Sequence, residues 1–349
     1  MKLEQQLSKA RDFLSRITPE DNVGIIYHKD TDGVCSAALI IKGVKKLAEG
    51  RGLVINVSAA IPSTYDVLDS SFRELKDCDK IVILDISLYA DVPEGKDILL
   101  IDHHQVKDSR SSDSVTFVNP RLERADIYRP ATYVVYKLMS SMIDMKEDEW
   151  IAVMGIIGDV GFEDCMDVLR GWVSVKTKDE LYGTRLGRAG DRLLGASYEI
   201  GMPAILERLL EFKNIEELES DKAISRYFEI YNNHLEDGIK QFWDNVEEHG
   251  NIMFAIIKPH YQRLTSPIIN RLSFQNRGKA LFLFEEKNGK YKVSARFQDI
   301  VKYDSLHLGE IMNKCGHGGG HRSAAGGMIL PGEIEDFKVC VLATLKGVV

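Results

Sequence analysis

Four places in the N-terminal half of the chain carry acidic or histidine side chains directly after a short apolar segment. The apolar segments at 23–27, 80–84, 98–101 and 152–157 run, in that order, into His28-Lys-Asp30-Thr-Asp32, Asp85, Asp102-His103-His104 and Gly158-Asp159. The first three segments are as short as buried strands usually are. Segments with helical periodicity separate them, and this alternation predicts an α/β domain with a mostly parallel sheet.

The same patterns predict the remaining elements. In the first half we expect strands at 23–27, 53–57, 80–84, 98–101 and 115–118, and helices at 1–15, 34–47, 66–75, 131–143 and 147–157. A helical stretch, 168–245, follows. Beyond it we expect strands at 252–257, 280–284 and 291–295 and helices at 267–273, 305–315 and 333–345. We divide the chain into a domain at 1–195, a helical connection at 196–245, and a smaller α/β domain with a mixed sheet at 246–349.

Side chains at the carboxyl ends of neighbouring parallel strands line the crevice in which such sheets bind ligands. Two divalent ions about 3.5–4 Å apart can neutralise phosphate oxygens and activate a water molecule there. Mixed carboxylate and imidazole ligands suit Mn²⁺, with Mg²⁺, Co²⁺ or Zn²⁺ as substitutes. Asp85 is our candidate for a bridging ligand. The spacing allows one ion to be held by His28 and Asp30 and the other by Asp32, His103 and Asp159, although it does not prove this partition.

Each of these residues also has a purely structural interpretation. Asp-x-Asp-Gly after a strand often forms only a turn, an isolated Asp85 often caps a helix, and His28 alone can be a surface histidine. Two adjacent histidines directly after an apolar strand are harder to explain, because burying them without polar partners is costly. The four places taken together favour a metal site.

A glycine-rich segment in the C-terminal part is the second motif. It reads Cys315-Gly-His-Gly318-Gly319-Gly320-His321-Arg322-Ser-Ala-Ala-Gly326-Gly327. Consecutive glycines let backbone amides approach an anion, and an arginine adds a donor suited to phosphate. The structural alternative is a flexible glycine loop. Upstream, Ser294 and Arg296 end an expected strand and could supply a second phosphate contact, or Arg296 could be a solvated surface charge.

With these motifs the sequence resembles the DHH phosphoesterase superfamily, which is named for the motif present here as Asp102-His103-His104. The resemblance implies a site for two divalent cations, Mn²⁺ above all, built from His28, Asp30, Asp32, Asp85, His103 and Asp159. It also implies that Asp102 orients a neighbouring histidine, as carboxylates beside metal ligands commonly do. His104 would lie beside the scissile phosphate.

The C-terminal segment resembles the DHH-associated domain, whose motif GGGHxxAAG matches from Gly318 to Gly326. This resemblance implies substrate contacts by Ser294, Arg296, Gly318, Gly319, Gly320 and His321. The lysine-rich motif of family II pyrophosphatases is not found, and neither are the membrane segments of cyclic-dinucleotide phosphodiesterases.

Two groups of relatives remain, and they imply different substrates. RecJ-like exonucleases hydrolyse single-stranded nucleic acid, DNA or RNA, to 5′-mononucleotides, and this is the activity that we expect. The alternative is a nano-RNase that also acts as an adenosine 3′,5′-bisphosphate phosphatase. A third possibility is a replisome scaffold related to RecJ, with components such as GINS as partners, but the expected ligands are all present, which argues against pure loss of activity.

Composition sets further expectations. Residues 251–349 contain 14 Lys and Arg against 8 Asp and Glu, whereas the whole chain has a net charge of −8. A basic C-terminal module can present a local face for anions. No apolar run is long enough to span a bilayer, and residues 1–17 lack the apolar core of a signal peptide, so we expect a cytoplasmic protein without membrane contact. The five scattered cysteines form no CxxC pair and are expected to be reduced thiols.

Overall fold

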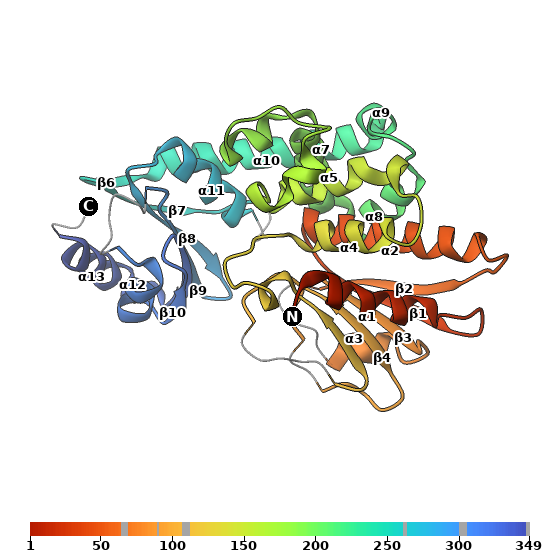
Figure 1. Ribbon diagram of the computed structural model, residues 1–349. Coiled ribbons are helices and arrows are strands. Elements are labelled where there is room, and N and C mark those ends of the chain that lie inside the picture. The colour runs from red at the N-terminus through yellow and green to blue at the C-terminus, as the bar shows by residue number, and fades with distance from the viewer. Residues whose placement is uncertain (64–68, 89–90, 107–111, 261–263, 300–305, 347–349) are drawn as a thin grey trace. The chain divides into compact units, whose positions relative to one another are not determined.

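A computed structural model describes residues 1–63, 69–88, 91–106, 112–260, 264–299 and 306–346 (Figure 1). The chain divides into two units, Met1–Phe228 and Glu229–Val349. The boundary falls inside one long helix, α10 (Lys222–Asn245). Each unit contains its own sheet, so each is described separately. In the part of the chain that is described, no helix is both long and apolar enough to cross a membrane.

The N-terminal unit is built on a five-stranded sheet in which every paired neighbour is parallel. Its strands are β1 (Asn22–His28), β2 (Asn56–Ser63), β3 (Lys80–Leu84), β4 (Asp97–Ile101) and β5 (Val115–Val118). The order is β2-β1-β3-β4-β5, so β2 lies at one edge while β1, β3 and β4 are adjacent. The predicted parallel α/β domain is therefore confirmed.

Side chains alternate between the two faces of this sheet, because successive residues of a strand point to opposite sides. Ile25, Val82 and Leu99 belong to the apolar cluster on one face, whereas Ile26 and Ile83 belong to the cluster on the other. The first cluster also includes side chains of α1 (Leu3–Ser15), α2 (Thr31–Glu49) and α4 (Ala131–Ser140). The opposite cluster includes Phe72 of the short helix α3 (Asp69–Glu74). Figure 1 shows α2 and α4 side by side along the sheet.

Further helices pack against α2 and α4 or against one another. They are α5 (Glu149–Gly158), α6 (Met166–Leu169), α7 (Arg185–Ile200), α8 (Met202–Glu211) and α9 (Ile215–Ser220). Helix α5 is apolar on every side, and Trp150, Ile151 and Val153 are fully buried. A helix that is apolar all round must lie inside the protein, which places the residue that ends α5, Asp159, beside the sheet rather than on a remote surface.

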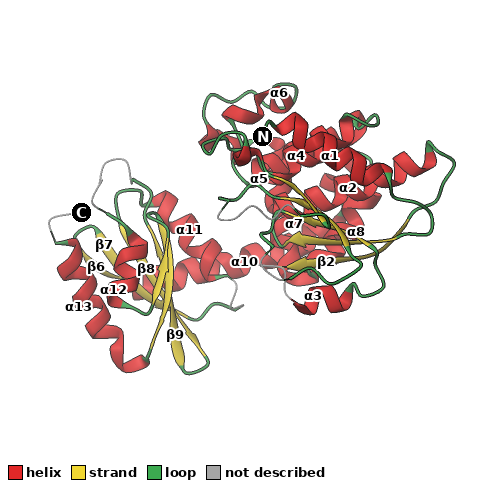
Figure 2. Ribbon diagram, turned by 60° about the horizontal axis from the view of Figure 1, so that its bottom comes forward, coloured by secondary structure: helices red, strands yellow, loops and turns green. Residues whose placement is uncertain are grey.

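The C-terminal unit contains a mixed sheet, as predicted, and this sheet has six strands. Its strands are β6 (Glu247–His249), β7 (Ile252–Ile257), β8 (Ala280–Lys287), β9 (Lys290–Arg296), β10 (Gly318–Gly320) and β11 (Ala324–Ile329). In the order β10-β11-β9-β8-β7-β6, only β7 and β8 are parallel. Figure 2 shows α12 (Leu308–Cys315) and α13 (Ile334–Leu345) on one side of this sheet and α11 (Thr265–Gln275) on the other.

Several predicted elements differ from the observed ones. The strand expected at 53–57 begins three residues later, at Asn56. The helix expected at 66–75 is described only over α3, since 64–68 lie outside the described residues, and the one expected at 305–315 begins at Leu308. Strands β10 and β11 were not predicted, because glycine and alanine carry none of the β-branched pattern that identifies strands.

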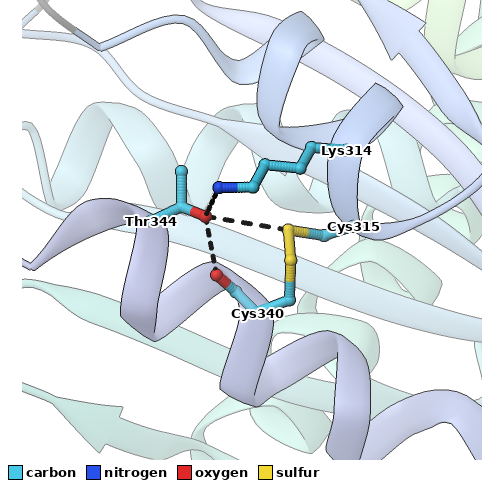
Figure 3. The surroundings of a disulfide bond; sticks show 4 residues. All are labelled: Lys314, Cys315, Cys340 and Thr344. Carbon is cyan, nitrogen blue, oxygen red and sulfur yellow. Dashed lines mark hydrogen bonds between the residues drawn. A yellow bond between two sulfur atoms is a disulfide. The ribbon is translucent and has the colours of Figure 1, made fainter.

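The prediction of reduced thiols is wrong for two of the five cysteines. Cys315 and Cys340 form a disulfide that joins the end of α12 to α13 (Figure 3). Thr344 lies beside the bond, and its hydroxyl donates to the Cys340 carbonyl at 2.8 Å. The two cysteines are 25 residues apart, so their spacing carries no motif, and only the packing of the two helices brings them together. Cys35, Cys78 and Cys165 are buried and take no part in this bond.

Candidate metal centre

The strand order gathers three of the predicted motifs at one edge of the N-terminal sheet. His28 is the last residue of β1, Asp85 follows β3, and Asp102-His103-His104 follow β4. These three strands are neighbours and parallel, so their carboxyl ends lie side by side. The fourth motif, at Asp159, reaches the same place from the end of α5.

The turn between β1 and α2 presents His28 and Asp30 together. The Nδ1 atom of His28 lies 2.5 Å from Oδ2 of Asp30 and 3.4 Å from Oδ2 of Asp85. Asp30 caps α2, because its Oδ1 accepts a hydrogen bond from the Gly33 amide at 2.9 Å. A Cβ atom at Gly33 would lie 2.3 Å from the His28 carbonyl oxygen, so only glycine lets the helix start this close to the strand end.

Asp32 is held by the start of another helix. Its two carboxylate oxygens accept hydrogen bonds from the amides of Ala131 and Thr132, each at 2.8 Å, at the first turn of α4. The first amides of a helix have no partner within the helix and favour a negative charge. This anchoring directs the buried carboxylate toward the strand ends, where its Oδ2 lies 3.8 Å from His103 Nε2.

Asp85 occupies the centre of the cluster. Its φ of 61° is a left-handed conformation that aspartate and asparagine tolerate better than other side chains. Its Oδ1 lies 3.0 Å from His103 Nε2, yet among the described residues this atom accepts no aligned hydrogen bond. A buried carboxylate oxygen without a hydrogen bond is costly. Its position between two groups of potential ligands fits an atom that contacts a cation.

Asp159 is contacted by Tyr128, a residue that belongs to no sequence motif. The hydroxyl of Tyr128 donates to Oδ2 of Asp159 at 2.5 Å, and the same oxygen lies 3.3 Å from His103 Nε2. The Tyr128 ring meets the ring of His103 edge-on, with centroids 5.5 Å apart. Tyr128 belongs to the segment between β5 and α4, where the sequence has no periodicity and no metal-binding pattern.

Asp102 and His104 form a separate pair next to these groups. Oδ1 of Asp102 lies 2.7 Å from Nδ1 of His104 and accepts the amide of His103 at 2.8 Å. His104 is half exposed, whereas Asp102 is buried. Two residues that the sequence did not single out support this loop: Asn119 donates to the His104 carbonyl at 3.0 Å and Arg121 donates to the His103 carbonyl at 2.7 Å.

The charges in the cluster are not balanced by protein side chains alone. Burial, together with the negative charge of Asp85, raises the pKa of Asp32, and burial with the charge of Asp30 raises the pKa of Asp85. Burial by itself would lower the pKa of His28, but the hydrogen bonds and charges of Asp30 and Asp85 outweigh it and raise that pKa to about 11. Without a metal the centre therefore retains protons, which a divalent cation would replace.

The potential metal-ligand atoms fall into sets of three residues, and each set could hold a metal ion. Ligand atoms lie within 4.8 Å of one another in three sets, which are His28-Asp30-Asp85, Asp32-His103-Asp159 and Asp85-His103-His104. Asp85 and His103 each belong to two sets. Carboxylate oxygens with imidazole nitrogens suit Mn²⁺ and related divalent ions. The residues present thus fit a pair of divalent cations.

The glycine-rich segment forms an edge strand rather than a loop. Gly318, Gly319 and Gly320 pair with Gly327, Gly326 and Ala325 of β11. A Cβ atom at Gly318 would lie 2.1 Å from the Gly326 carbonyl oxygen, whereas one at Gly319 would meet nothing within 4 Å. Close packing of the strands therefore requires glycine at Gly318, while Gly319 leaves an open approach to the backbone.

The other predicted substrate contacts lie on or beside the same sheet. Ser294 is buried in β9 opposite Gly326, and His321 is exposed directly after β10. Arg296 at the end of β9 donates to Oδ1 of Asn270 at 2.7 Å and to Oγ of Ser266 at 3.4 Å, both on α11. The α11 partners were not anticipated, since a polar pair inside an apolar helical pattern carries no signal of its own.

Two family models match the chain. Residues 22–157 match the DHH family, N-terminal domain, and residues 253–347 match the DHHA1 domain. The first range contains the three strand-end motifs and the second contains the glycine strand. A sequence comparison with curated proteins gives no match.

Solved structures share the fold at low sequence identity. RecJ from Thermus thermophilus in complex with Mn²⁺ is 14% identical with a TM-score of 0.70, over 97% of this chain and 54% of that one. This chain thus spans about half the length of that protein. An exonuclease RecJ bound to manganese is 16% identical with a TM-score of 0.69, over 98% of this chain and 94% of that one.

A third similar structure is the pGpG-specific phosphodiesterase PggH from Vibrio cholerae. It is 14% identical with a TM-score of 0.56, over 94% of this chain and 100% of that one. Identities this low show the fold alone, whereas the two family models identify both domains. The chain belongs to the DHH superfamily, with an N-terminal DHH domain and a C-terminal DHHA1 domain.

Proposed function

We propose that the protein is a metal-dependent phosphodiesterase that removes 5′-mononucleotides from single-stranded nucleic acid. The observation that carries this proposal is the convergence of six potential ligands, in two groups of three, at the ends of β1, β3, β4 and α5. The DHH family consists generally of metal-dependent phosphoesterases, and two similar RecJ structures contain manganese. The first fact supports a metal-dependent activity, and the second supports manganese as one metal that fits the site.

The proposed roles follow from position. His28 and Asp30 would hold one ion and Asp32, His103 and Asp159 the other, with Asp85 between them. When bound, the two ions would neutralise phosphate oxygens and lower the pKa of a water molecule. Asp102 fixes the ring of His104 through Nδ1, so the opposite ring nitrogen of this half-exposed histidine is available to a phosphate oxygen or to the leaving group.

The C-terminal unit is proposed to bind the substrate. Arg296 presents a guanidinium, which suits phosphate. The exposed backbone at Gly319 allows close approach of an anion. With Ser294, Gly318, Gly320 and His321, these residues are the proposed substrate contacts.

The test uses full-length protein with Mn²⁺ and single-stranded DNA and RNA labelled at either end. Asp85→Asn is the inactive variant, and asparagine is chosen because it tolerates the left-handed backbone at this position. Asp97→Asn is the matched control, since Asp97 begins β4 at the opposite edge of the sheet. We expect wild type and Asp97→Asn to release labelled mononucleotide and Asp85→Asn to release none. Equal activity in all three proteins would overturn the proposal.

A second candidate is a phosphodiesterase for very short RNA. It is supported by the similarity to the pGpG-specific phosphodiesterase, which covers 94% of this chain and 100% of that one. Comparing rates on a dinucleotide, adenosine 3′,5′-bisphosphate and a long strand separates the candidates. A preference for the long strand supports the exonuclease, and a preference for the dinucleotide or the bisphosphate supports the alternative.

A further inference from the structure

Tyr128 contacts two of the proposed ligands of the same metal ion. Its hydroxyl donates to Oδ2 of Asp159 at 2.5 Å. Its ring and the ring of His103 form a T-shaped pair, with the ring planes at 81°. Asp159 and His103 come from segments that are far apart in the sequence, so a single side chain links the end of α5 to the loop after β4.

Three carboxylates of the centre, those of Asp30, Asp32 and Asp159, are held in two different ways. Asp30 and Asp32 accept hydrogen bonds from backbone amides, at the first turns of α2 and α4. Asp159 instead follows the end of α5, where a helix offers carbonyl groups rather than amides. The donor to its carboxylate is the phenol of Tyr128. Tyr128 thus supplies to Asp159 the kind of hydrogen bond that backbone amides supply to Asp30 and Asp32.

Tyr128 is itself fixed on several sides, as a residue must be if it is to orient another. Its amide donates to Oδ2 of Asp164 at 2.9 Å. The guanidinium of Arg121 lies 5.7 Å from the centre of its ring. The same arginine donates through Nε to the His103 carbonyl at 2.7 Å. The ring and the two ligands that it contacts therefore form one connected arrangement.

We propose that Tyr128 is a positioning residue that orients Asp159 and His103 to bind one of the two metal ions. The inference rests on the metal-dependent function proposed above. Replacing a group that orients a metal ligand by a hydrogen bond typically weakens metal binding by about 10- to 100-fold. Loss of the hydroxyl leaves the carboxylate of Asp159 free to rotate, so the ion held by Asp32, His103 and Asp159 should bind more weakly while the other ion is unaffected.

The first experiment measures Mn²⁺ binding to metal-free, full-length protein by calorimetry. Tyr128→Phe is compared with wild type and with Tyr136→Phe. Tyr136 is a matched control, because its hydroxyl also donates to a carboxylate, that of Glu149 at 2.8 Å, outside the metal centre. We expect one of two binding events to weaken about tenfold in Tyr128→Phe and both to stay unchanged in Tyr136→Phe. The unfolding temperature of the metal-free protein should fall by a similar amount in the two variants.

The second experiment separates positioning from direct action on the substrate. If Tyr128 acts through Asp159, excess Mn²⁺ restores the turnover of Tyr128→Phe, and KM for the nucleic acid stays unchanged. In an Asp159→Asn background, Tyr128→Phe should cause no further loss of Mn²⁺ affinity. Additive losses would show that the tyrosine acts independently of Asp159.

The outcomes distinguish failure of this inference from failure of the proposed function. Wild-type Mn²⁺ affinity in Tyr128→Phe overturns the positioning role, and so does a turnover defect that excess Mn²⁺ does not restore. Equal weakening in Tyr128→Phe and Tyr136→Phe also overturns it, since the effect would then be structural. If wild-type protein binds no Mn²⁺ and Asp85→Asn behaves as wild type, the proposed function itself fails.

Discussion

His103 Nε2 lies 3.0 Å from Oδ1 of Asp85, although the two residues follow different strands. The register of β3 on β4 pairs Leu84 with Ile101, and the Asp85 amide donates to the Ile101 carbonyl at 2.9 Å. Pairing of the strands therefore sets the separation of the two side chains. A slip of one residue would turn Asp85 to the other face of the sheet.

Replacing Asp85 should separate activity from stability. In Asp85→Asn we expect turnover to fall about a thousandfold or more, equivalent to roughly 4 kcal/mol of transition-state stabilisation. The metal-free variant should unfold at a temperature no lower than wild type, because asparagine removes a carboxylate whose pKa is raised by burial and by the charge of Asp30. Thermal unfolding with and without Mn²⁺ provides the check.

Mn²⁺ should stabilise wild type and Asp97→Asn but have little effect on Asp85→Asn. A marked fall in the unfolding temperature of metal-free Asp85→Asn would contradict the assignment, since it would give this carboxylate a structural role that does not depend on metal.

The stability gained from Mn²⁺ should increase with pH. In the metal-free protein the pKa of His28 is raised to about 11, and the pKa values of Asp32 and Asp85 are raised as well. Groups that hold protons more tightly in the folded state contribute stability that is lost as pH rises above their unfolded-state values. For His28 this loss extends from its ordinary pKa of 6.5 to about 11.

Bound metal replaces these protons, so the rise in unfolding temperature caused by Mn²⁺ should be larger at about pH 8.5 than at about pH 6. His28→Gln should show a weaker pH dependence. His249→Gln, which alters an exposed histidine of β6, should behave as wild type. A Mn²⁺ effect that is constant across this range would count against proton displacement.

Two neighbouring glycines of β10 should respond differently to alanine. In Gly318→Ala the new methyl group would overlap the Gly326 carbonyl, and overpacking of this kind costs about 1–3 kcal/mol. Gly319→Ala meets no neighbouring atom and should change the free energy of unfolding by less than about 0.5 kcal/mol. Urea unfolding of both variants measures the difference.

If the Gly319 backbone contacts the substrate, Gly319→Ala should raise KM several-fold with an unchanged unfolding midpoint. Wild-type KM in this variant would remove Gly319 from the proposed substrate contacts without affecting the metal centre.

The disulfide should stabilise the C-terminal unit. A bond that closes a segment of 25 residues is worth about 3 kcal/mol, chiefly because it restricts the unfolded chain. A reductant should therefore lower the unfolding temperature of wild type but leave Cys340→Ser unchanged. The other three cysteines are buried, so they should contribute little to the effect. An unfolding temperature of wild type that is insensitive to reductant would show that Cys315 and Cys340 are thiols in solution.

The local pattern of the sequence was sufficient to predict the parallel domain and the strands and helices at whose ends its polar residues lie. Strand and helix periods repeat within a few residues, so β1, β3, β4 and β5 are predicted nearly at their observed bounds. Helices α4 and α5 follow for the same reason. Candidate ligands could be named because the polar atoms of histidines and aspartates are costly to bury at strand ends without a polar partner.

Contacts between distant segments leave no periodic pattern in the sequence, so they could not be predicted in this way. Only the tertiary structure decided that β2 lies at the edge of the sheet, so that His28, Asp85 and His103 meet. Only packing placed Tyr128 on Asp159, made the glycine segment an edge strand, and brought Cys315 to Cys340. The sequence by itself determined which residues stand at the ends of its elements, because that is a property of neighbouring positions. The tertiary structure decided which of those ends meet, because strand pairing and helix packing join positions that no short pattern relates.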